Sequence, residues 1–286
     1  MDARSGAVGD TSFADRYRAA VTDRGRLCAG IDPHPELLEA WGLSVDAAGV
    51  CAFGDICVEA FAGSVAVIKP QVAFFETFGS AGFAALESVI SGCQAGGALV
   101  IADGKRGDIG STMAAYARAW LEPASPLCAD ALTVSPYLGF GSLSPAIELA
   151  RSKGRAVFAL ARTSNPEGES LQLARGDGGV TVAQSIVDAA AAENSDGRAT
   201  VGLVVGATRH HGLQLGELGA PILAPGLGAQ GAAASDLPAV FADADQRWVL
   251  PASSRSVLRH GPDVAALRDA ARRTRDEIEA AFWEQA

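Results

Sequence analysis

The sequence predicts a single (β/α)8 barrel (TIM barrel), and two observations carry that prediction. Eight short apolar runs alternate with segments of helical periodicity, the order expected when a helix follows each strand of a parallel barrel. The length of 286 residues suits one barrel of this kind, which typically needs about 250. No stretch has the composition of a linker, so we expect residues 1–286 to form one domain, with a lead-in helix in residues 1–24 and a closing helix in residues 263–286.

Each predicted strand is a short apolar run that ends in a turn residue or a charge. We expect the eight strands at residues 27–32, 65–69, 98–102, 131–135, 156–161, 201–205, 221–225 and 248–252. Apolar residues at helical spacing predict helices at residues 13–24, 45–62, 78–92, 113–121, 145–153, 182–193 and 264–283. Residues 209–218 and 238–244 show a weaker helical pattern, and residues 193–219 suggest no function.

Composition limits the possible partners. The chain is 49% apolar but only 6% aromatic, which favours a core of small aliphatic side chains and argues against disorder. Lys and Arg number 23 against 33 Asp and Glu, for a net charge of −10. Such an acidic balance disfavours nucleic acid and anionic membranes as partners, so an anionic ligand would need local positive contacts.

The cysteines and the N-terminus predict a cytoplasmic protein. Five cysteines, an odd number with no CxxC spacing, suggest reduced thiols. Four histidines form no zinc signature, and the adjacent pair His210 and His211 lies in a polar turn where solvation is expected. The first residues contain no apolar signal segment, and no run approaches 18 apolar residues, so we expect neither secretion nor a membrane span.

The chemistry is expected to centre on residues 101–112, where a buried strand leads into Asp103, Lys105 and Asp108. Side chains alternate along a strand, so Asp103 and Lys105 should point the same way and Gly104 the other. Ser111 or Thr112 is expected to cap the following helix. Two carboxylates around a lysine can fix its ammonium against a substrate, although a salt-bridged surface turn would have the same pattern.

Further polar residues follow the other predicted strands. Active sites of (β/α)8 barrels lie at the carboxyl ends of the strands. The residues expected there are Asp32, Lys69, Asp103, Lys105, Ser135, Arg162, Thr163, Ser164, Gln230 and Arg255. Two lysines and two aspartates at strand ends on one barrel face indicate a functional cluster.

The last two strands predict a phosphate site. Residues 225–231 form a glycine-rich loop that starts at Pro225, and Arg255 follows the eighth strand among serines. Phosphate sites of these barrels recur at this pair of loops, and arginine binds phosphate through paired hydrogen bonds. Gly228 is a candidate amide donor. In the loop after the fifth strand, Ser164 and Asn165 could bind an amide-bearing ring or serve as ordinary turn residues.

Taken together, these motifs resemble orotidine 5'-phosphate decarboxylase, in its longer bacterial branch. The resemblance extends in order over residues 27–256. It rests on Asp32-Pro, Lys69-Pro-Gln-x-Ala-Phe-Phe-Glu, Asp103-x-Lys-Arg-Gly-Asp-Ile-Gly-x-Thr, Thr163-Ser-Asn-Pro-Glu-Gly and Pro225-Gly-x-Gly-Ala-Gln-Gly. It implies a carboxy-lyase that converts orotidine 5'-monophosphate to UMP in pyrimidine biosynthesis, with no cofactor and no metal. It also implies a homodimer whose sites are shared across the interface.

The resemblance also implies residue roles. Lys105 would protonate C6 of the pyrimidine as carbon dioxide leaves, and Asp103 would crowd the substrate carboxylate. The other positions are implied to contact the nucleotide: Asp32, Lys69 and Thr112 at the ribose, Ser164 at the base, and Gln230 and Arg255 at the phosphate. Three residues are implied to come from the neighbouring subunit, namely Asp108, Ile109 and Thr112. A fixed ammonium would stabilise carbanion character on the ring electrostatically.

Other interpretations remain open from the residues themselves. A metal-dependent sugar-phosphate decarboxylase or aldolase would need Mg²⁺ ligands such as Asp103 and Glu76. Schiff-base catalysis by Lys69 or Lys105 would need a lowered lysine pKa, which adjacent carboxylates oppose. A non-catalytic nucleotide-binding barrel would be expected to lack part of the charged set, yet all four charged positions are present.

Overall fold

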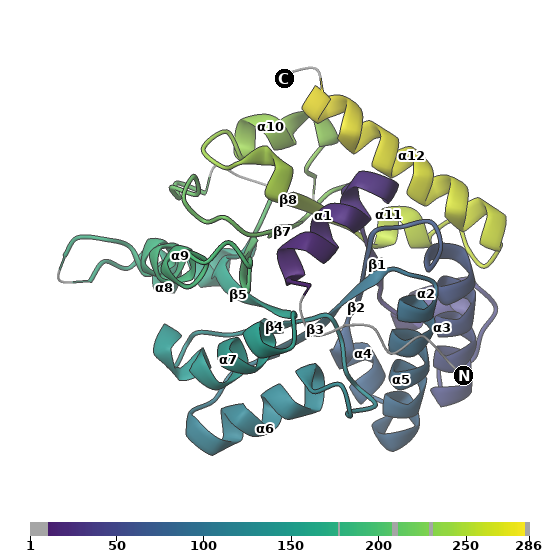
Figure 1. The fold of residues 1–286 in the computed structure, drawn as a ribbon. Helices are drawn as coiled ribbons and strands as arrows, with labels where there is room; N and C mark the ends of the chain where they lie inside the picture. The colour runs from purple at the N-terminus through teal and green to yellow at the C-terminus, as the bar shows by residue number, and fades with distance from the viewer. Residues whose placement is uncertain (1–10, 177, 208–210, 229–230, 284–286) are drawn as a thin grey trace, which may run out of the picture.

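Eight parallel strands close into a barrel in sequence order, which confirms the predicted fold class (Figure 1). In this computed structural model the described residues are 11–176, 178–207, 211–228 and 231–283. The strands are β1 (Cys28–Ile31), β2 (Val67–Pro70), β3 (Leu99–Arg106), β4 (Ala131–Val134), β5 (Ala156–Arg162), β6 (Val201–Val205), β7 (Ile222–Pro225) and β8 (Val249–Ser253). Every predicted strand overlaps an observed one. The largest difference is β3, which continues to Arg106.

Helices surround the barrel, and the seven predicted with a clear pattern are confirmed. The α-helices are α1 (Phe13–Arg24), α2 (Pro35–Ala40), α3 (Ala47–Phe61), α4 (Val72–Glu76), α5 (Gly79–Ala95), α6 (Gly110–Leu121), α7 (Ser144–Ser152), α8 (Glu169–Gln172), α9 (Val182–Glu193), α10 (Leu237–Val240), α11 (Arg255–Leu258) and α12 (Val264–Trp283). Short 3₁₀ helices are η1 (Phe140–Leu143), η2 (Pro166–Gly168), η3 (Ala234–Asp236) and η4 (Gln246–Trp248). The weak pattern at 238–244 yields only α10, and residues 211–218 contain no helix.

The predicted cap of α6 is wrong. The helix begins at Gly110, and its N-cap is Ile109, which makes no capping hydrogen bond through its side chain. The Asp108 carboxylate instead accepts a hydrogen bond from the Ile109 N–H at 2.8 Å. The chain has therefore turned into the helix before Ser111 and Thr112, which lie in its first turn.

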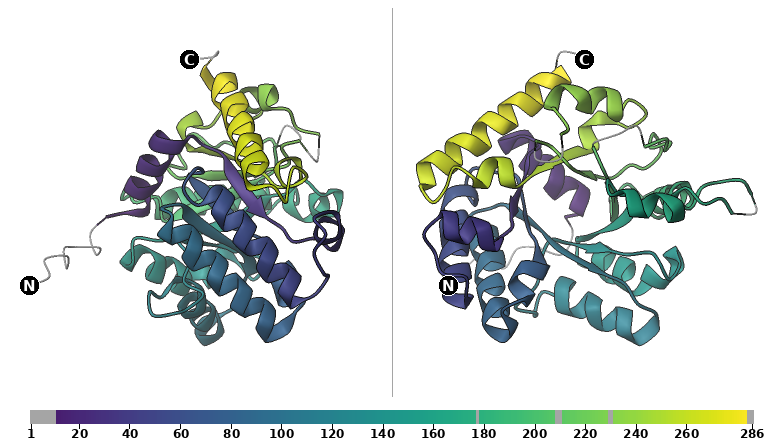
Figure 2. Two further views of the ribbon diagram at one scale, coloured as in Figure 1. Left: turned by 90° about the vertical axis from the view of Figure 1, so that its right-hand side faces the viewer. Right: turned by 180° about the vertical axis from the view of Figure 1, so that it is seen from behind.

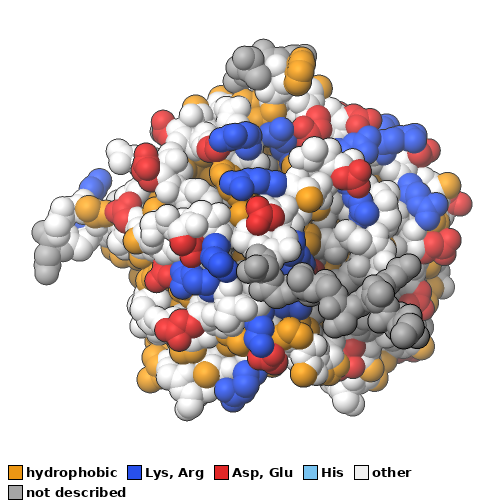
Figure 3. Space-filling view, in the orientation of Figure 1, with side chains coloured by type: hydrophobic (Ala, Val, Ile, Leu, Met, Phe, Trp, Pro, Cys, Tyr) orange, Lys and Arg blue, Asp and Glu red, His pale blue; other side chains and the backbone are white. Residues whose placement is uncertain are grey.

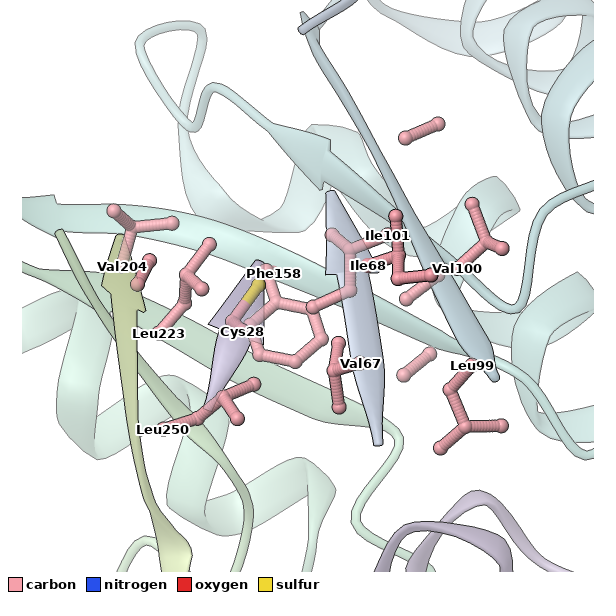
Figure 4. Packing of buried hydrophobic residues seen from close by; sticks show 14 of the residues in the cluster. Cys28, Val67, Ile68, Leu99, Val100, Ile101, Phe158, Val204, Leu223 and Leu250 are labelled. Atoms are coloured by element: carbon pink, nitrogen blue, oxygen red, sulfur yellow. The ribbon is translucent and has the colours of Figure 1, made fainter. Parts of the chain in front are cut away.

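Aliphatic side chains fill the barrel interior around one large ring, that of Phe158 in β5 (Figure 4). Phe158 is fully buried, and a Cβ on Gly202 of the neighbouring β6 would lie 2.6 Å from its Cε1 atom. Only glycine leaves room there for the ring. Although the chain has few aromatic residues, the Phe158 ring therefore fills the centre of the barrel.

Helix α1 closes the amino end of the barrel and leaves the carboxyl end open for a site. The ring of Phe13 packs edge-on against Phe158 at 6.2 Å, and the ring of Tyr17 stacks on Trp248, directly before β8, at 5.4 Å. Figure 1 is seen from this amino end, with α1 in front of the strands, and the right view of Figure 2 is seen from behind. Among the described residues no helix is long and apolar enough to cross a bilayer.

Candidate active site

A cavity of about 350 Å³ lies at the carboxyl end of the barrel. Its walls come from the ends of most strands and from the loops that follow them. Of the predicted site residues, it brings together nine: Asp32, Lys69, Asp103, Lys105, Thr163, Ser164, Asn165, Pro225 and Arg255. Residues that are far apart in the sequence thus meet in one cavity because parallel strands end at the same face.

Two lysines flank one aspartate along a wall of this cavity, and we name Lys69, Asp103 and Lys105 the charged row. The Lys69 ammonium lies 2.9 Å from Oδ2 of Asp103, and the Lys105 ammonium lies 2.7 Å from Oδ1. The side chains of Lys69 and Asp103 are 7% and 9% exposed, whereas that of Lys105 is 47% exposed. Lys105 is therefore the member of the row that a ligand in the cavity can reach most readily.

An irregularity in β3 brings Lys105 to this position. The register of β3 against β4 shifts between Ala102 and Arg106, and Lys105 has a φ of 45°, in the left-handed region. Such a backbone costs energy for a residue with a side chain, so the surroundings must hold it. Thr133 of β4 does so, because its hydroxyl oxygen accepts a hydrogen bond from the Lys105 N–H at 2.9 Å. Gly104 faces Leu132 and Arg106, away from the charged row as predicted.

Two members of the charged row, Lys69 and Asp103, are held in their ionised forms. Burial alone would lower the pKa of Lys69, but the carboxylates of Asp103 and Asp32 outweigh that effect and raise it. Burial alone would raise the pKa of Asp103, but the ammonium groups of Lys69 and Lys105 outweigh it and lower it. The raised pKa of Lys69 opposes Schiff-base chemistry at that residue, which needs a neutral amine.

Asp32 presents a buried acceptor to the cavity. Its Oδ1 atom lies 3.9 Å from the Lys69 ammonium and has no hydrogen-bond partner among the described residues. A buried carboxylate oxygen without a partner is costly. A ligand hydroxyl that donates to it would remove that cost.

The predicted phosphate residues divide into three groups. Pro225 and Arg255 line the cavity, together with the adjacent Gly226 and Leu227. Gly228 is not among the lining residues, and its N–H donates to the Ala232 carbonyl at 2.9 Å, so the suggested role as an amide donor is not supported. Gln230 lies outside the described residues.

Asp108, Ile109 and Thr112 do not line the cavity of their own chain. Ile109 is 63% exposed, and Thr112 is also exposed. They lie after β3 and in the first turn of α6, on the outside of the same barrel end. Ile109 and Thr112 are thus accessible to another molecule, and Asp108 is partly buried.

Several polar residues of the site were missed from the sequence. The fully buried Thr133 donates its hydroxyl to Oδ1 of Asp103 at 2.8 Å, and Gln71 accepts a hydrogen bond from the Lys69 ammonium at 3.1 Å. His34 and Ser254 line the cavity as well. Gln71 belongs to the motif that begins at Lys69, which could have indicated it. Thr133 lies inside an apolar strand, where a threonine is common.

One close approach explains why β1 carries a glycine beside this site. A Cβ on Gly30 would lie 1.8 Å from Oγ of Ser254. The absence of a side chain thus lets the loop after β8, which leads into Arg255, lie directly against β1.

The residues proposed for a magnesium site are not assembled. Glu76 forms an ion pair with Arg106, whose guanidinium also lies 5.6 Å from the ring of Trp120. Within the described part of the chain, no group of three or more His, Cys, Asp or Glu side chains is arranged to hold a metal ion.

The position of this cavity, charged along one wall at the carboxyl end of the strands, defines the chain as a barrel enzyme. Residues 25–270 match the model of the Orotidine 5'-phosphate decarboxylase / HUMPS family, and the chain belongs to that family. This confirms the resemblance drawn from the sequence motifs.

Individual relatives are similar to this chain over nearly its whole length. A curated protein of Salinispora arenicola, named orotidine 5'-phosphate decarboxylase, is 56% identical over 274 residues, which cover 95% of this chain and 98% of the relative. A crystal structure from Streptomyces avermitilis superposes with a TM-score of 0.90 at 54% identity and covers 96% of both chains. The structure of Leishmania donovani OMP decarboxylase has a TM-score of 0.75 at 32% identity and covers 96% of this chain and all of that one.

Proposed function

We propose that this protein decarboxylates orotidine 5'-monophosphate to UMP and carbon dioxide. The observation that carries the proposal is the charged row, in which a half-exposed Lys105 ammonium is held 2.7 Å from a buried Asp103 carboxylate at the cavity wall. Family membership and the names of relatives at 52–56% identity support the same reaction.

Lys105 is the proposed proton donor. Loss of carbon dioxide leaves an electron pair on C6 of the pyrimidine, and a preorganised ammonium stabilises that charge before it gives up a proton to the carbon. Asp103 orients the Lys105 ammonium through the contact at 2.7 Å and, being ionised, faces the substrate carboxylate with like charge. No electron acceptor is required, because the pair left by the broken C–C bond forms the new C–H bond.

The remaining cavity residues are proposed to hold the rest of the nucleotide. Asp32 has an unpartnered buried oxygen suited to a ribose hydroxyl, and Lys69 lies beside it. Arg255, which follows β8 and lines the cavity, is proposed to bind the phosphate together with Gln230 of the loop after β7. Ser164 is proposed to contact the base. Binding energy at the phosphate can then contribute to the reaction at C6.

We also propose that the enzyme is a homodimer with Asp108, Ile109 and Thr112 reaching the partner's site. The exposure of Ile109 and Thr112, between the end of β3 and the first turn of α6, supports this arrangement. Two apolar side chains in the loop after the neighbouring strand β4 are also exposed, Tyr137 by 75% and Leu138 by 53%. A partner subunit would cover them.

The first experiment is UV-monitored loss of orotidine 5'-monophosphate, with EDTA present, for wild type and Lys105→Ala. We expect turnover by wild type and a loss of at least about a thousandfold in kcat for the variant, since a general acid and its charge are both removed. Circular dichroism checks folding. If the folded wild type does not turn over orotidine 5'-monophosphate, a metal-dependent sugar-phosphate reaction is favoured instead, and it is tested with Mg²⁺ added back.

A subunit-mixing experiment tests the shared site. Lys105→Ala and Asp108→Ala proteins, each inactive alone, are mixed in equal amounts under conditions of subunit exchange. If Asp108 acts across the interface, half of the dimers carry one intact site, and about a quarter of wild-type activity returns. If Asp108 acts within its own chain, mixing restores nothing.

A further inference from the structure

A second cavity lies at the opposite, amino end of the barrel. Its volume of about 630 Å³ exceeds that of the active-site cavity, and it is bounded by α1, by the residues just before β8 and by the second half of α12. We name it the amino-end cavity. None of its lining residues belongs to the active-site cavity, so a ligand bound there would not touch the charged row.

The lining of the amino-end cavity is positive although the chain is acidic. Among its described lining residues five are arginines, namely Arg18, Arg24, Arg26, Arg247 and Arg275, against the two acids Asp23 and Glu279. Figure 3 shows this end of the molecule, with Lys and Arg side chains gathered in the upper part of the face where α1 and α12 lie. In a chain with a net charge of −10 this local concentration indicates an anionic ligand.

One of these arginines, Arg18, lies over an aromatic ring and leaves its donors available. The other four are each paired with a carboxylate: Arg24 with Asp23, Arg26 with Glu279, Arg247 with Asp245 and Arg275 with Asp276. The Arg18 guanidinium carbon lies 4.8 Å from the ring centre of Trp248, and no described carboxylate forms a salt bridge with Arg18. The Arg26 guanidinium carbon lies 4.5 Å from the ring centre of Phe282, although its nitrogens also contact Glu279. Arg18 therefore keeps its in-plane N–H groups free for an anion. An anion with several charges can also compete for exposed pairs such as Arg247 with Asp245, which contribute little energy in water.

A buried hydroxyl adds a second polar feature. Tyr17 lines the amino-end cavity, is 1% exposed, and its hydroxyl has no hydrogen-bond partner among the described residues. Burial raises the pKa of Tyr17, so the hydroxyl stays protonated and can donate. A buried hydroxyl without a partner costs free energy that a bound oxyanion would recover.

We propose that the amino-end cavity binds a polyphosphate group, as carried by inorganic polyphosphate or a nucleoside triphosphate. Several guanidinium groups around one cavity match the spread charge of linked phosphates better than a single oxyanion. The Trp248 ring is already in contact with Arg18 and stacked on Tyr17, so recognition rests on the phosphates rather than on stacking of a base.

Isothermal titration of the full chain with sodium tripolyphosphate tests the proposal. The test variant is Arg18→Gln/Arg247→Gln, because both side chains are exposed and Arg247 is 88% exposed. The matched control, Arg272→Gln/Arg273→Gln, removes the same charge from exposed positions of α12 that do not line the cavity. We expect affinity to fall about tenfold or more in the test variant and to change little in the control. Absence of binding to wild type, or equal weakening in both variants, overturns the proposal.

Two further arms separate this site from the catalytic one and define the ligand. Arg255→Gln, at the opposite end of the barrel, should bind tripolyphosphate as wild type does, and loss of binding there would assign the anion to the active site. Inorganic phosphate should bind much more weakly than tripolyphosphate, and equal affinity would contradict a polyphosphate site. ATP that binds more tightly than tripolyphosphate would identify the nucleotide as the source. Circular dichroism monitors folding, and Arg247→Gln alone replaces the double variant if that one unfolds.

Discussion

At the scale of single residues, Thr133 shows how one buried hydroxyl supports the charged row. It donates to Oδ1 of Asp103 at 2.8 Å and accepts from the Lys105 N–H at 2.9 Å, so it touches both the proposed proton donor and its carboxylate partner. It also lies beside the residue whose φ is in the left-handed region. We therefore regard Thr133 as a positioning residue.

Replacement of Thr133 by Val should lower kcat by roughly tenfold to a hundredfold, the cost of an unsatisfied hydrogen bond to a buried charge. Steady-state kinetics with orotidine 5'-monophosphate measure the effect. Thr133→Ser keeps the hydroxyl and should recover most of the rate. A Val variant with wild-type kcat would show that the hydroxyl does not position the row.

Lys69 should make stability fall at alkaline pH. Its folded pKa is raised by Asp103 and Asp32, against the opposing effect of burial, so above the unfolded value of about 10.4 the unfolded chain loses a proton that the folded chain keeps. This contribution is fully present below about pH 10.4 and decreases by about 1.4 kcal/mol per pH unit above it, until the folded pKa is reached.

Urea unfolding of wild type and Lys69→Met between about pH 9 and 12 isolates this effect, because the other titrating groups are common to both proteins. The difference in the free energy of unfolding should shrink as the pH rises. Parallel curves would mean that the pKa of Lys69 is not raised in the folded protein.

At the scale of elements, two helices differ in whether a side chain caps their first turn. The Thr181 hydroxyl caps α9 by accepting from the Gln184 N–H at 3.1 Å, whereas Ser111, expected as a cap, lies in the first turn of α6. Thr181→Ala should therefore reduce the free energy of unfolding by about 1 kcal/mol.

Ser111→Ala is the matched control for that change, since it also removes a hydroxyl at the start of a helix but no capping bond. We expect its effect to stay within about 0.5 kcal/mol in chemical denaturation. A loss in Ser111→Ala equal to that in Thr181→Ala would show that the side chain does cap α6.

At the scale of the whole molecule, the fold buries most of the cysteine thiols. Cys51 is exposed and the other four free cysteines are buried. Burial raises the pKa of Cys28 and of Cys93 to about 12, so neither forms a thiolate at neutral pH.

We predict that Ellman's reagent modifies one thiol per native chain at pH 8, at Cys51, and all five after denaturation. A Cys51→Ser variant, the control, should show almost no reaction while folded. Rapid modification of several native thiols would contradict the packing around β1 and between α3 and α5.

Much of the active site was predictable because strand position and residue chemistry coincide in this fold. Asp32, Lys69, Asp103 and Arg255 follow apolar strands, and in a parallel barrel every such position faces the same end. The role of Gly228 stays a prediction. Its N–H donates within the loop in this structure, which glycine content alone does not reveal. Thr133 was missed because nothing in its strand distinguishes a buried hydroxyl that bonds Asp103 from one that bonds the backbone.

The alternation of apolar strands and amphipathic helices, with charges at strand ends, by itself determined the barrel, its catalytic end and the family. These features are local or periodic, so they can be read along the chain. Only the tertiary structure decided the bulge that turns Lys105 toward Asp103, the unpartnered oxygen of Asp32 and the cluster of arginines at the amino end. Each depends on distances between segments far apart in sequence, and burial and electrostatic energy depend on those distances.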